Sequence, residues 1–547
     1  MSLPSVPTHI RYYVVLIAMF AAVLLYLERV CLSVAEVYIR EDLSIDKDRM
    51  AWVLGAFFIA YALGQVPAGW LSQRYGPRLM MTLYMLGWSI FGVFIALAQD
   101  FWTLFAARFL LGLSQAGAYP TAAILVKRWV PDRSRGLASS IVVFGGRFGG
   151  AGANWLTGIL IVAFVPLSQS ALLTESQILN VEPITKPTEE MAKEQGRLSE
   201  LQPLRVRVRS NFIEKSDVSG LNTLISSPMT ANGLELDKVG LASDGKAIAA
   251  KPAEQRTQAE TERLNRLLLE KAFPGAIRQL HVDGWRPTLL IYGIGGLVVG
   301  ILFWIVARDF PRQHPWANEA EKEFIERGQV AAAQTAGTDA IPFGPLIRSR
   351  NQWMLSANQV FSNIGWVPLI TLMPRFLDER YHVPVDERGL MTTIPLLVAS
   401  LVLIIGGWAT DKLTLRYGKR LGRSLPMGIA KLPCVVAMLT IPFLPTAWAV
   451  VIALTIMAAC QDFGIPAVWA FAQDTAGKQV GPVIGWANMW GNFGAGLAPL
   501  LMRQIEKVNG WDGVMYCGAI AFLLCAITGM LANANEPLFP STESKNK

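Results

Sequence analysis

The stretch GWLSQRYG at residues 69–76 decides the fold, because a looser copy occurs in the second half of the chain. The copy reads GWATDK at 407–412 and closes with YG at 417–418. Two further motif pairs follow nearly the same register: Gln115 with Pro120 and Gln461 with Pro466, then GRFG at 146–149 and GNFG at 491–494. Offsets of 338, 346 and 345 residues relate the three pairs. We therefore predict two halves in parallel repeat, an architecture typical of transporters.

The composition indicates a polytopic membrane protein in contact with a lipid bilayer. Of the 547 residues, 52% are hydrophobic and 16% are charged, whereas a soluble domain has about 25% charged residues. The 17 Trp and 25 Phe suit aromatic belts at both membrane interfaces. The net charge of +8 does not indicate nucleic-acid binding, because most of the surplus lies in a few short loops, as in cytoplasmic membrane loops. A soluble enzyme, a disordered scaffold and a fibrous protein are poor fits.

The apolar runs predict an all-α membrane protein with twelve transmembrane helices in two six-helix halves. A helix that crosses a bilayer needs roughly 20 apolar residues, and runs of this kind centre near residues 23, 60, 88, 113, 150, 297, 362, 398, 435, 459, 492 and 523. Basic residues follow the second, fourth and eighth runs, so we expect both termini in the cytoplasm. A large polar insertion separates the fifth and sixth runs and is expected outside the cytoplasm.

We divide the chain into six segments. Residues 1–165 hold helices 1–5 of the N-terminal half, 166–283 form the extracytoplasmic insertion, 284–309 form helix 6, 310–349 form a cytoplasmic linker, 350–535 hold helices 7–12, and 536–547 form a cytoplasmic tail. Within the insertion, 204–212 alternates like a strand and 253–272 has the pattern of an amphipathic helix. In the linker, Asn318 is a predicted N-cap for a short helix that ends near Arg327.

Ionisable residues inside membrane helices are costly, and their default interpretation is functional. Glu28 and Arg29 lie in the first run and Arg147 lies in the fifth. Arg29 could hold an anion, Glu28 could titrate, and the planar fork of Arg147 suits a carboxylate or phosphate. The alternatives are structural ion pairs for Glu28 and Arg29, and bonds to exposed carbonyls for Arg147. For Arg108 and Asp462 a structural role is favoured.

Several polar and aromatic residues are candidates for lining a site between the halves: Tyr26, Tyr61, Gln115, Asn363, Trp469, Asn488 and Asn492. Each one alone is also explained by packing or by a hydrogen bond between helices. The chain has no phosphate-binding loop of the G-x-x-x-x-G-K-[ST] type and no G-x-S-x-G or H-E-x-x-H motif. The five cysteines lie in apolar runs without metal-site spacing. We expect no enzyme activity, no cofactor and no metal.

At this point the motifs resemble a known family. The 69–78 loop is similar to the loop signature of major facilitator superfamily transporters, and its weaker copy includes Asp411. Four further stretches resemble the anion:cation symporters, a group with galactonate, hexuronate and glucarate transporters: YLER at 26–29, QVPAGW at 65–70, AYP at 118–120 and MTTIP at 391–395. The resemblance covers both halves and excludes the insertion.

The resemblance implies roles for individual residues. Arg29 would bind the substrate carboxylate, and Glu28 stands in the place of a proton-carrying Asp. Tyr26, Tyr61, Trp469 and Asn488 would line the sugar-acid site. The gating loop would include Gly69, Arg74, Gly76, Arg78 and, in its copy, Asp411.

This sequence departs from the family pattern at three positions. Gln115 stands where the family often has a coupling acid in helix 4, which puts a two-proton mechanism in doubt. Arg147 replaces a substrate-binding Gln and hints at a dianionic or phosphorylated substrate. Gln73 replaces the usual Asp of the loop and suggests an altered gating equilibrium.

These observations predict a secondary transporter that imports a small organic anion, a sugar acid or related carboxylate, by proton-coupled alternating access. An antiporter of organophosphate and phosphate, or of organic anions, is the nearest alternative. A transporter-like sensor that uses the outer insertion is the second. We expect an integral protein of a bacterial inner membrane that needs no protein partner and functions as a monomer.

Overall fold

The computed structural model describes residues 6–179, 201–208, 213–236, 239–273, 275–327, 340–367, 372–381, 383 and 385–538. In these residues the fold is helical, and β-pairing is limited to one isolated bridge between Ile178 and Ile277. Eight described helices are long and apolar enough to cross a membrane. Each predicted apolar run lies on a helix, but the runs near 150 and 362 lie on helices outside these eight.

The N-terminal half is a bundle in which the fourth apolar run is broken into two helices. Its helices are α1 (Ile10–Asp42), α2 (Lys47–Tyr75), α3 (Pro77–Leu97), α4 (Phe101–Gln115), α5 (Ala118–Trp129), α6 (Arg135–Ala163) and α12 (Trp285–Val306). Asp100 caps α4 by accepting from the backbone N–H of Trp102 and Thr103 at 2.8 and 3.0 Å. The break between α4 and α5 follows Gln115 directly, at the first motif that the second half repeats.

The C-terminal half repeats this plan, including the break. Its helices are α15 (Arg350–Val367), α16 (Met373–Tyr381), α17 (Val385–Gly428), α18 (Leu432–Thr440), α19 (Ala447–Phe463), α20 (Ile465–Thr475) and α21 (Val480–Leu531). Two of them turn sharply at glycines of positive φ, α17 at Gly418 (78°) and α21 at Gly510 (62°). The break between α19 and α20 follows Gln461 closely and matches the break after Gln115.

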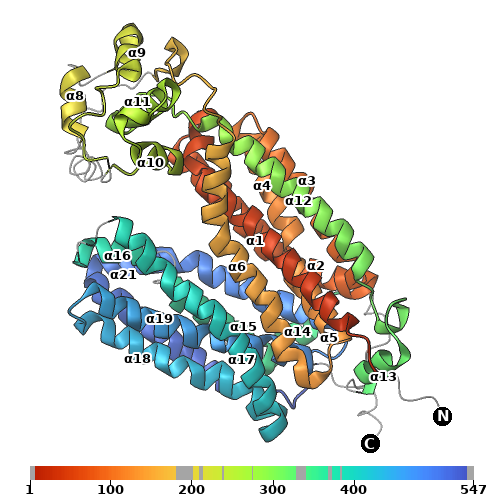
Figure 1. Ribbon diagram of the computed structural model, residues 1–547. Helices are drawn as coiled ribbons and strands as arrows, with labels where there is room; N and C mark the ends of the chain where they lie inside the picture. The colour runs from red at the N-terminus through yellow and green to blue at the C-terminus, as the bar shows by residue number, and fades with distance from the viewer. Residues whose placement is uncertain are drawn as a thin grey trace, which may run out of the picture.

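The two halves meet at one end and diverge toward the other (Figure 1). At the meeting end lie α14 (Phe343–Arg348) and the linker helix α13 (Glu319–Arg327), which begins where the sequence predicts. Asn318 accepts from the backbone N–H of Glu321 at 2.9 Å, as expected of an N-cap. The buried Glu321 pairs with Arg11 at 3.1 Å and so fixes the linker to the start of α1.

Residues of the 166–283 segment pack around a hydrophobic cluster of their own beyond the diverging end of α1 and α6 (Figure 1). Its helices are α8 (Gln202–Val208), α9 (Val218–Ser226), α10 (Ser243–Ala249) and α11 (Gln258–Ala272). The predicted amphipathic helix is therefore present, and it begins at Gln258 because Thr257 and Glu260 form a capping box.

The predicted strand over 204–212 is wrong for its described part. Residues 202–208 are helical, and 209–212 lie outside the described residues. The alternation of Leu204, Val206 and Val208 also suits a helix, because Leu204 and Val208 are four residues apart. Leu204 is buried and Val208 packs on the same cluster, whereas Val206 is 70% exposed.

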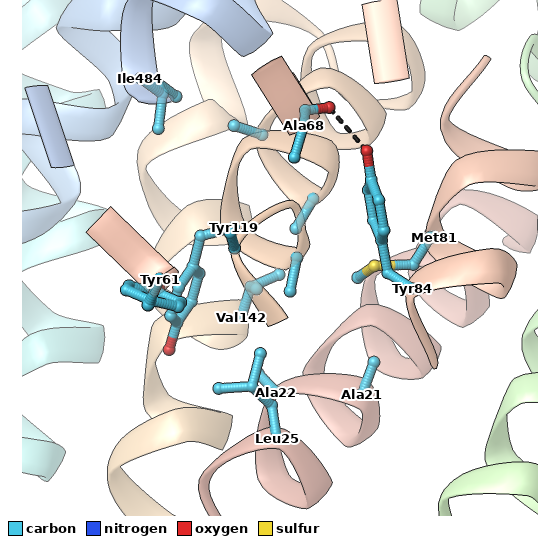
Figure 2. Close-up of a cluster of buried hydrophobic side chains, with 14 of the residues drawn as sticks. Ala21, Ala22, Leu25, Tyr61, Ala68, Met81, Tyr84, Tyr119, Val142 and Ile484 are labelled. Carbon is cyan, nitrogen blue, oxygen red and sulfur yellow. Dashed lines mark hydrogen bonds between the residues drawn. The ribbon is translucent and has the colours of Figure 1, made fainter. Parts of the chain in front are cut away.

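The core of the N-terminal half extends to the boundary with the other half. Figure 2 shows side chains of α1, α2, α3, α5 and α6 packed together, with Ile484 of α21 beside them. Tyr84 donates to the Ala68 carbonyl at 2.8 Å, so its hydroxyl is satisfied inside this apolar region. Tyr61 and Tyr119 lie on the side of the cluster that faces the second half.

Candidate functional site

A cavity of about 880 Å³, which includes its open side, lies between the two halves. Its wall consists of sixteen residues: Tyr26, Arg29, Tyr61, Tyr119, Val143, Arg147, Gln359, Ser362, Asn363, Trp366, Gln461, Ile465, Trp469, Asn488, Gly491 and Asn492. The cavity therefore brings together six of the seven predicted substrate-binding residues, although their roles stay predictions.

Arg29 of α1 is one of two arginines that the N-terminal half contributes to the cavity wall. Its guanidinium carbon lies 4.7, 5.0 and 4.4 Å from the ring centres of Tyr26, Phe57 and Tyr61. Such ring faces attract a cation without neutralising its charge. One terminal nitrogen of Arg29 is buried without a hydrogen-bond partner in the described structure. The guanidinium is thus held in place by ring faces, and no described carboxylate neutralises its charge.

Gln115 is the seventh predicted residue, and it lies behind Arg29 instead of on the cavity wall. Its Oε1 accepts from Arg29 Nε at 3.4 Å, and its Nε2 donates to the Leu25 carbonyl at 3.2 Å. Gln115 therefore orients Arg29 through one side of the guanidinium. The break after α4 places it there, because the helix ends at this residue.

Arg147 of α6 is the second cation on the wall, and it has a carboxylate partner. Its Nη2 donates to Asp462 Oδ1 at 2.9 Å, and its guanidinium carbon lies 4.8 Å from the Trp366 ring centre. Close packing of α6 on α1 brings it there. A Cβ added at Gly145 or Gly149 would overlap backbone carbonyls of α1, so glycine is required at both positions.

Glu28 faces away from the cavity, although it is adjacent to Arg29. Its carboxylate is buried beside Gly92 of α3 and Gly296 of α12, and a Cβ on Gly296 would lie 2.9 Å from Oε1. Neither oxygen has a hydrogen-bond partner among the described residues. The rotation of about 100° per helical residue accounts for this separation of the two charges.

The C-terminal wall is rich in side-chain amides. Gln359 donates to Asn488 Oδ1 at 3.3 Å, Asn363 donates to the Gln359 carbonyl at 2.9 Å, and Asn492 donates to the Asn488 carbonyl at 2.7 Å. Donors and acceptors of this kind match the hydroxyl groups of a polyol. Trp469 of α20 closes the wall against Tyr119, with ring centres 5.2 Å apart.

Several residues of the cavity wall are not predicted from the sequence. Tyr119, Gln359, Ser362, Trp366 and Gln461 were not predicted as site residues, and Asn363 and Asn492 were noted as polar candidates only. The AYP motif at 118–120 gave a signal for Tyr119, because it follows the helix break. No comparable pattern marks Gln359 or Trp366.

The meeting end below the cavity is closed by contacts between the halves. A Cβ added at Gly69 of α2 would overlap the Gly481 carbonyl of α21. Asp411 of α17 accepts from the backbone N–H groups of Gly136 and Leu137, both at 2.9 Å, at the start of α6. A carboxylate is favourable at a helix N-terminus. These contacts place Gly69 and Asp411 between the halves.

The other predicted gating residues contact their own half. Gly76 has a φ of 95°, and the backbone N–H of Arg78 donates to Asp309 Oδ1 at 2.9 Å. The Arg74 guanidinium carbon lies 5.4 Å from the Trp70 ring centre. Gln73 is buried near the start of α21, and its Oε1 has no hydrogen-bond partner among the described residues.

The profile of the Major Facilitator Superfamily matches residues 18–171, 277–499 and 355–546, which together exceed half of the chain. The chain belongs to the Major Facilitator Superfamily. The resemblance of its motifs to this superfamily is thereby confirmed.

Several relatives are named as sugar-acid transporters. The chain is 22% identical over 533 residues to the probable galactarate/D-glucarate transporter GudP of Bacillus subtilis, which covers 94% of this chain and 89% of that protein. It is 32% identical over 155 residues to the D-galactonate transporter of Escherichia coli, which covers 28% of this chain and 35% of that protein.

Solved structures agree on the fold. The Major Facilitator Superfamily transporter FucP aligns with a TM-score of 0.57 at 12% identity, over 95% of this chain and 99% of that chain. The xylose symporter XylE aligns with a TM-score of 0.55 at 13% identity, over 95% and 94%. This Major Facilitator Superfamily chain is therefore an integral membrane transporter and not an enzyme.

Proposed function

We propose that this transporter imports a small organic anion, a sugar acid or related carboxylate, by proton-coupled alternating access. The observation that carries the proposal is Arg29, a guanidinium on the wall of the cavity between the halves that is held by aromatic rings and pairs with no described carboxylate. A substrate carboxylate would supply this missing counter-charge through a charge-assisted hydrogen bond. The amides of the opposite wall would bind the hydroxyl groups, and the sugar-acid relatives favour this substrate class.

The proposal includes the membrane topology. We count one membrane crossing for each of the twelve apolar runs. In the N-terminal half, α4 and α5 together form one crossing and α6 is another. In the C-terminal half, α15 is one crossing, α19 and α20 together form one, α17 and α18 together form two with a turn at Gly418, and α21 forms two with a turn at Gly510. Short basic loops at the end where the halves meet favour a cytoplasmic location for that end, for the linker at 310–349 and for both termini. The insertion at 166–283 is then extracytoplasmic, and the cavity opens to the outside.

Glu28 is the proposed proton carrier. Its carboxylate is buried in the N-terminal half, and neither oxygen has a hydrogen-bond partner among the described residues. Because Glu28 and Arg29 are consecutive on α1, a small rotation of this helix would change both environments together. Glu28→Gln should therefore keep exchange of a monocarboxylate such as galactonate across proteoliposome membranes and lose its accumulation driven by a proton gradient. Accumulation at the normal level by Glu28→Gln would remove Glu28 from coupling.

The two alternatives have specific tests. A phosphate-linked antiporter gains support from the second arginine in the cavity, but Asp462 already neutralises Arg147. Exchange of phosphate for an organophosphate without a proton gradient would favour it. The sensor gains support from the separate hydrophobic cluster of the insertion. Retained uptake after deletion of residues 170–280 would argue against the sensor.

A further inference from the structure

The ion pair of Arg147 and Asp462 joins the two halves at the cavity wall. Arg147 belongs to α6 and Asp462 to α19, and their side chains are 25% and 0% exposed. Only the arginine faces the cavity, because Asp462 is absent from its wall. The carboxylate therefore contacts the guanidinium from outside the cavity wall, while the Arg147 side chain borders the space where a substrate would lie.

Asp462 depends on Arg147 for its charge. Its Oδ2 is buried without a hydrogen-bond partner among the described residues, and Arg147 is the side chain that contacts Oδ1. Lys431 acts on Asp462 electrostatically, but its Nζ is bound to the Gln461 carbonyl at 2.7 Å. Tyr26 and Tyr119 are the other titratable side chains that interact electrostatically with Arg147. A buried carboxylate that loses its one direct cation takes up a proton, because an unpaired buried charge is very costly.

The two cavity arginines differ in what they can bind. No described carboxylate pairs with Arg29, whereas Arg147 has one inside the protein. With Asp462 ionised, the site has a net charge of one from Arg29, which matches a monocarboxylate. With Asp462 protonated, both guanidinium groups are uncompensated, which matches a dicarboxylate.

We propose that Asp462 pairs with Arg147 at the position that a second substrate carboxylate would take, and that binding of a dicarboxylate adds one proton to Asp462. This inference rests on the proposed function and deepens it. The second carboxylate forms the bond to Arg147 that Asp462 gives up, and the proton is taken up from the buffered solvent. A monocarboxylate leaves the ion pair intact and takes up no proton at this position. Asp462 is thus a residue that determines specificity and links substrate charge to proton number.

The test compares two acids that differ at one end, galactarate with two carboxylates and galactonate with one. Their dissociation constants are measured by titration calorimetry on the full-length protein in detergent, from about pH 6 to about pH 8, where both acids are fully ionised. The protein contains Glu28→Gln, so that this carboxyl contributes no proton. We expect the galactarate constant to rise about tenfold per pH unit, as one bound proton requires, and the galactonate constant to stay level.

Asp462→Asn in the same background should make galactarate binding independent of pH, while galactonate binding stays measurable and has no pH dependence in either protein. Asp462→Glu, which keeps the carboxylate, should retain the slope. Retained galactonate binding shows that the variants are folded. The inference would be overturned if the galactarate dissociation constant changed with pH equally in Asp462→Asn and in its parent, or if it did not change with pH in the parent. Galactonate binding would still uphold the proposed function in either case. Failure of the parent protein to bind either acid would overturn both.

Discussion

Gly69 and Gly481 lie against each other where α2 and α21 cross, with no space for a side chain at either position. The internal repeat relates this contact to a second one, between Gly136 of α6 and Gly407 of α17. A Cβ on Gly136 would lie 2.8 Å from the Gly407 carbonyl oxygen. Two equivalent contacts therefore close the meeting end, so that separation of the halves there must break both.

Gly69→Val should shift the protein toward the state in which the meeting end is open. Overlap of the valine with the Gly481 backbone costs about 1–3 kcal/mol in the closed state. The ratio of closed to open molecules should fall by roughly 5-fold to 150-fold. Spin labels at Tyr75 and Arg416, which are exposed residues of the two halves, report the distance by electron–electron double resonance.

Gly55→Val on the same helix is the matched control, because a Cβ at Gly55 meets nothing within 4 Å. Its distance distribution should equal that of the parent protein. A distribution unchanged in Gly69→Val as well would show that this glycine contact does not hold the end closed.

Asp42 connects the insertion and α12 to the end of α1, and its loss should destabilise this junction. Its carboxylate accepts from Arg278 at 3.1 Å, from Trp285 Nε1 at 3.1 Å and from Arg286 at 2.9 Å. We expect Asp42→Asn to lower the free energy of unfolding by about 1–3 kcal/mol, with a corresponding decrease in Tm. Asp283→Asn is the control, since Asp283 is largely exposed and contacts Arg278 at 3.4 Å. Equal decreases in both variants would contradict the assignment.

Glu270 should make the insertion less stable as the pH rises. Burial raises the pKa of this carboxyl to about 7 from an ordinary 4.5, against the lowering effect of Arg266 and of the Leu280 N–H. Between about pH 4.5 and about pH 7 the folded insertion holds a proton that the unfolded chain has lost. Its free energy of unfolding therefore decreases with rising pH across this window, by at most about 3 kcal/mol.

Hydrogen exchange of the α11 amides in the full-length protein measures this effect. Glu270→Gln removes the titration, so the ratio of parent to variant protection should fall between about pH 5 and about pH 7.5. Glu262→Gln, on the same helix, should keep the pH trend of the parent. Identical trends in the parent and in Glu270→Gln would refute the assignment.

The sequence predicted the site best at positions where few residue types are tolerated inside a membrane helix. Charges are expensive inside apolar helices, so Arg29 and Arg147 could be identified as site candidates, and both line the cavity. The repeat indicated two related halves because its offsets nearly agree. In contrast, the pairing of Arg147 with Asp462 joins residues 315 positions apart, and it depends on how two helices of different halves are rotated.

A local sequence pattern did not predict the structure where the same pattern is compatible with two kinds of secondary structure. The alternation around Leu204 suits both a strand and a short helix, and packing on the insertion cluster decided for the helix. The role of Gln115 in substrate binding stays a prediction, and in the structure its side chain bonds to Arg29. Neither outcome could be obtained without the packing of neighbouring elements.

Uptake of labelled galactonate, glucuronate and glucarate into proteoliposomes, with and without an inward proton gradient, tests the central claim most directly. The parent protein should accumulate at least one of these acids only when the gradient is present. Arg29→Gln, with an unchanged Tm, should show no accumulation, because the charge that binds the carboxylate is gone. Accumulation by Arg29→Gln equal to that of the parent would contradict the account, as would the absence of gradient-driven accumulation of any of the three acids by the parent.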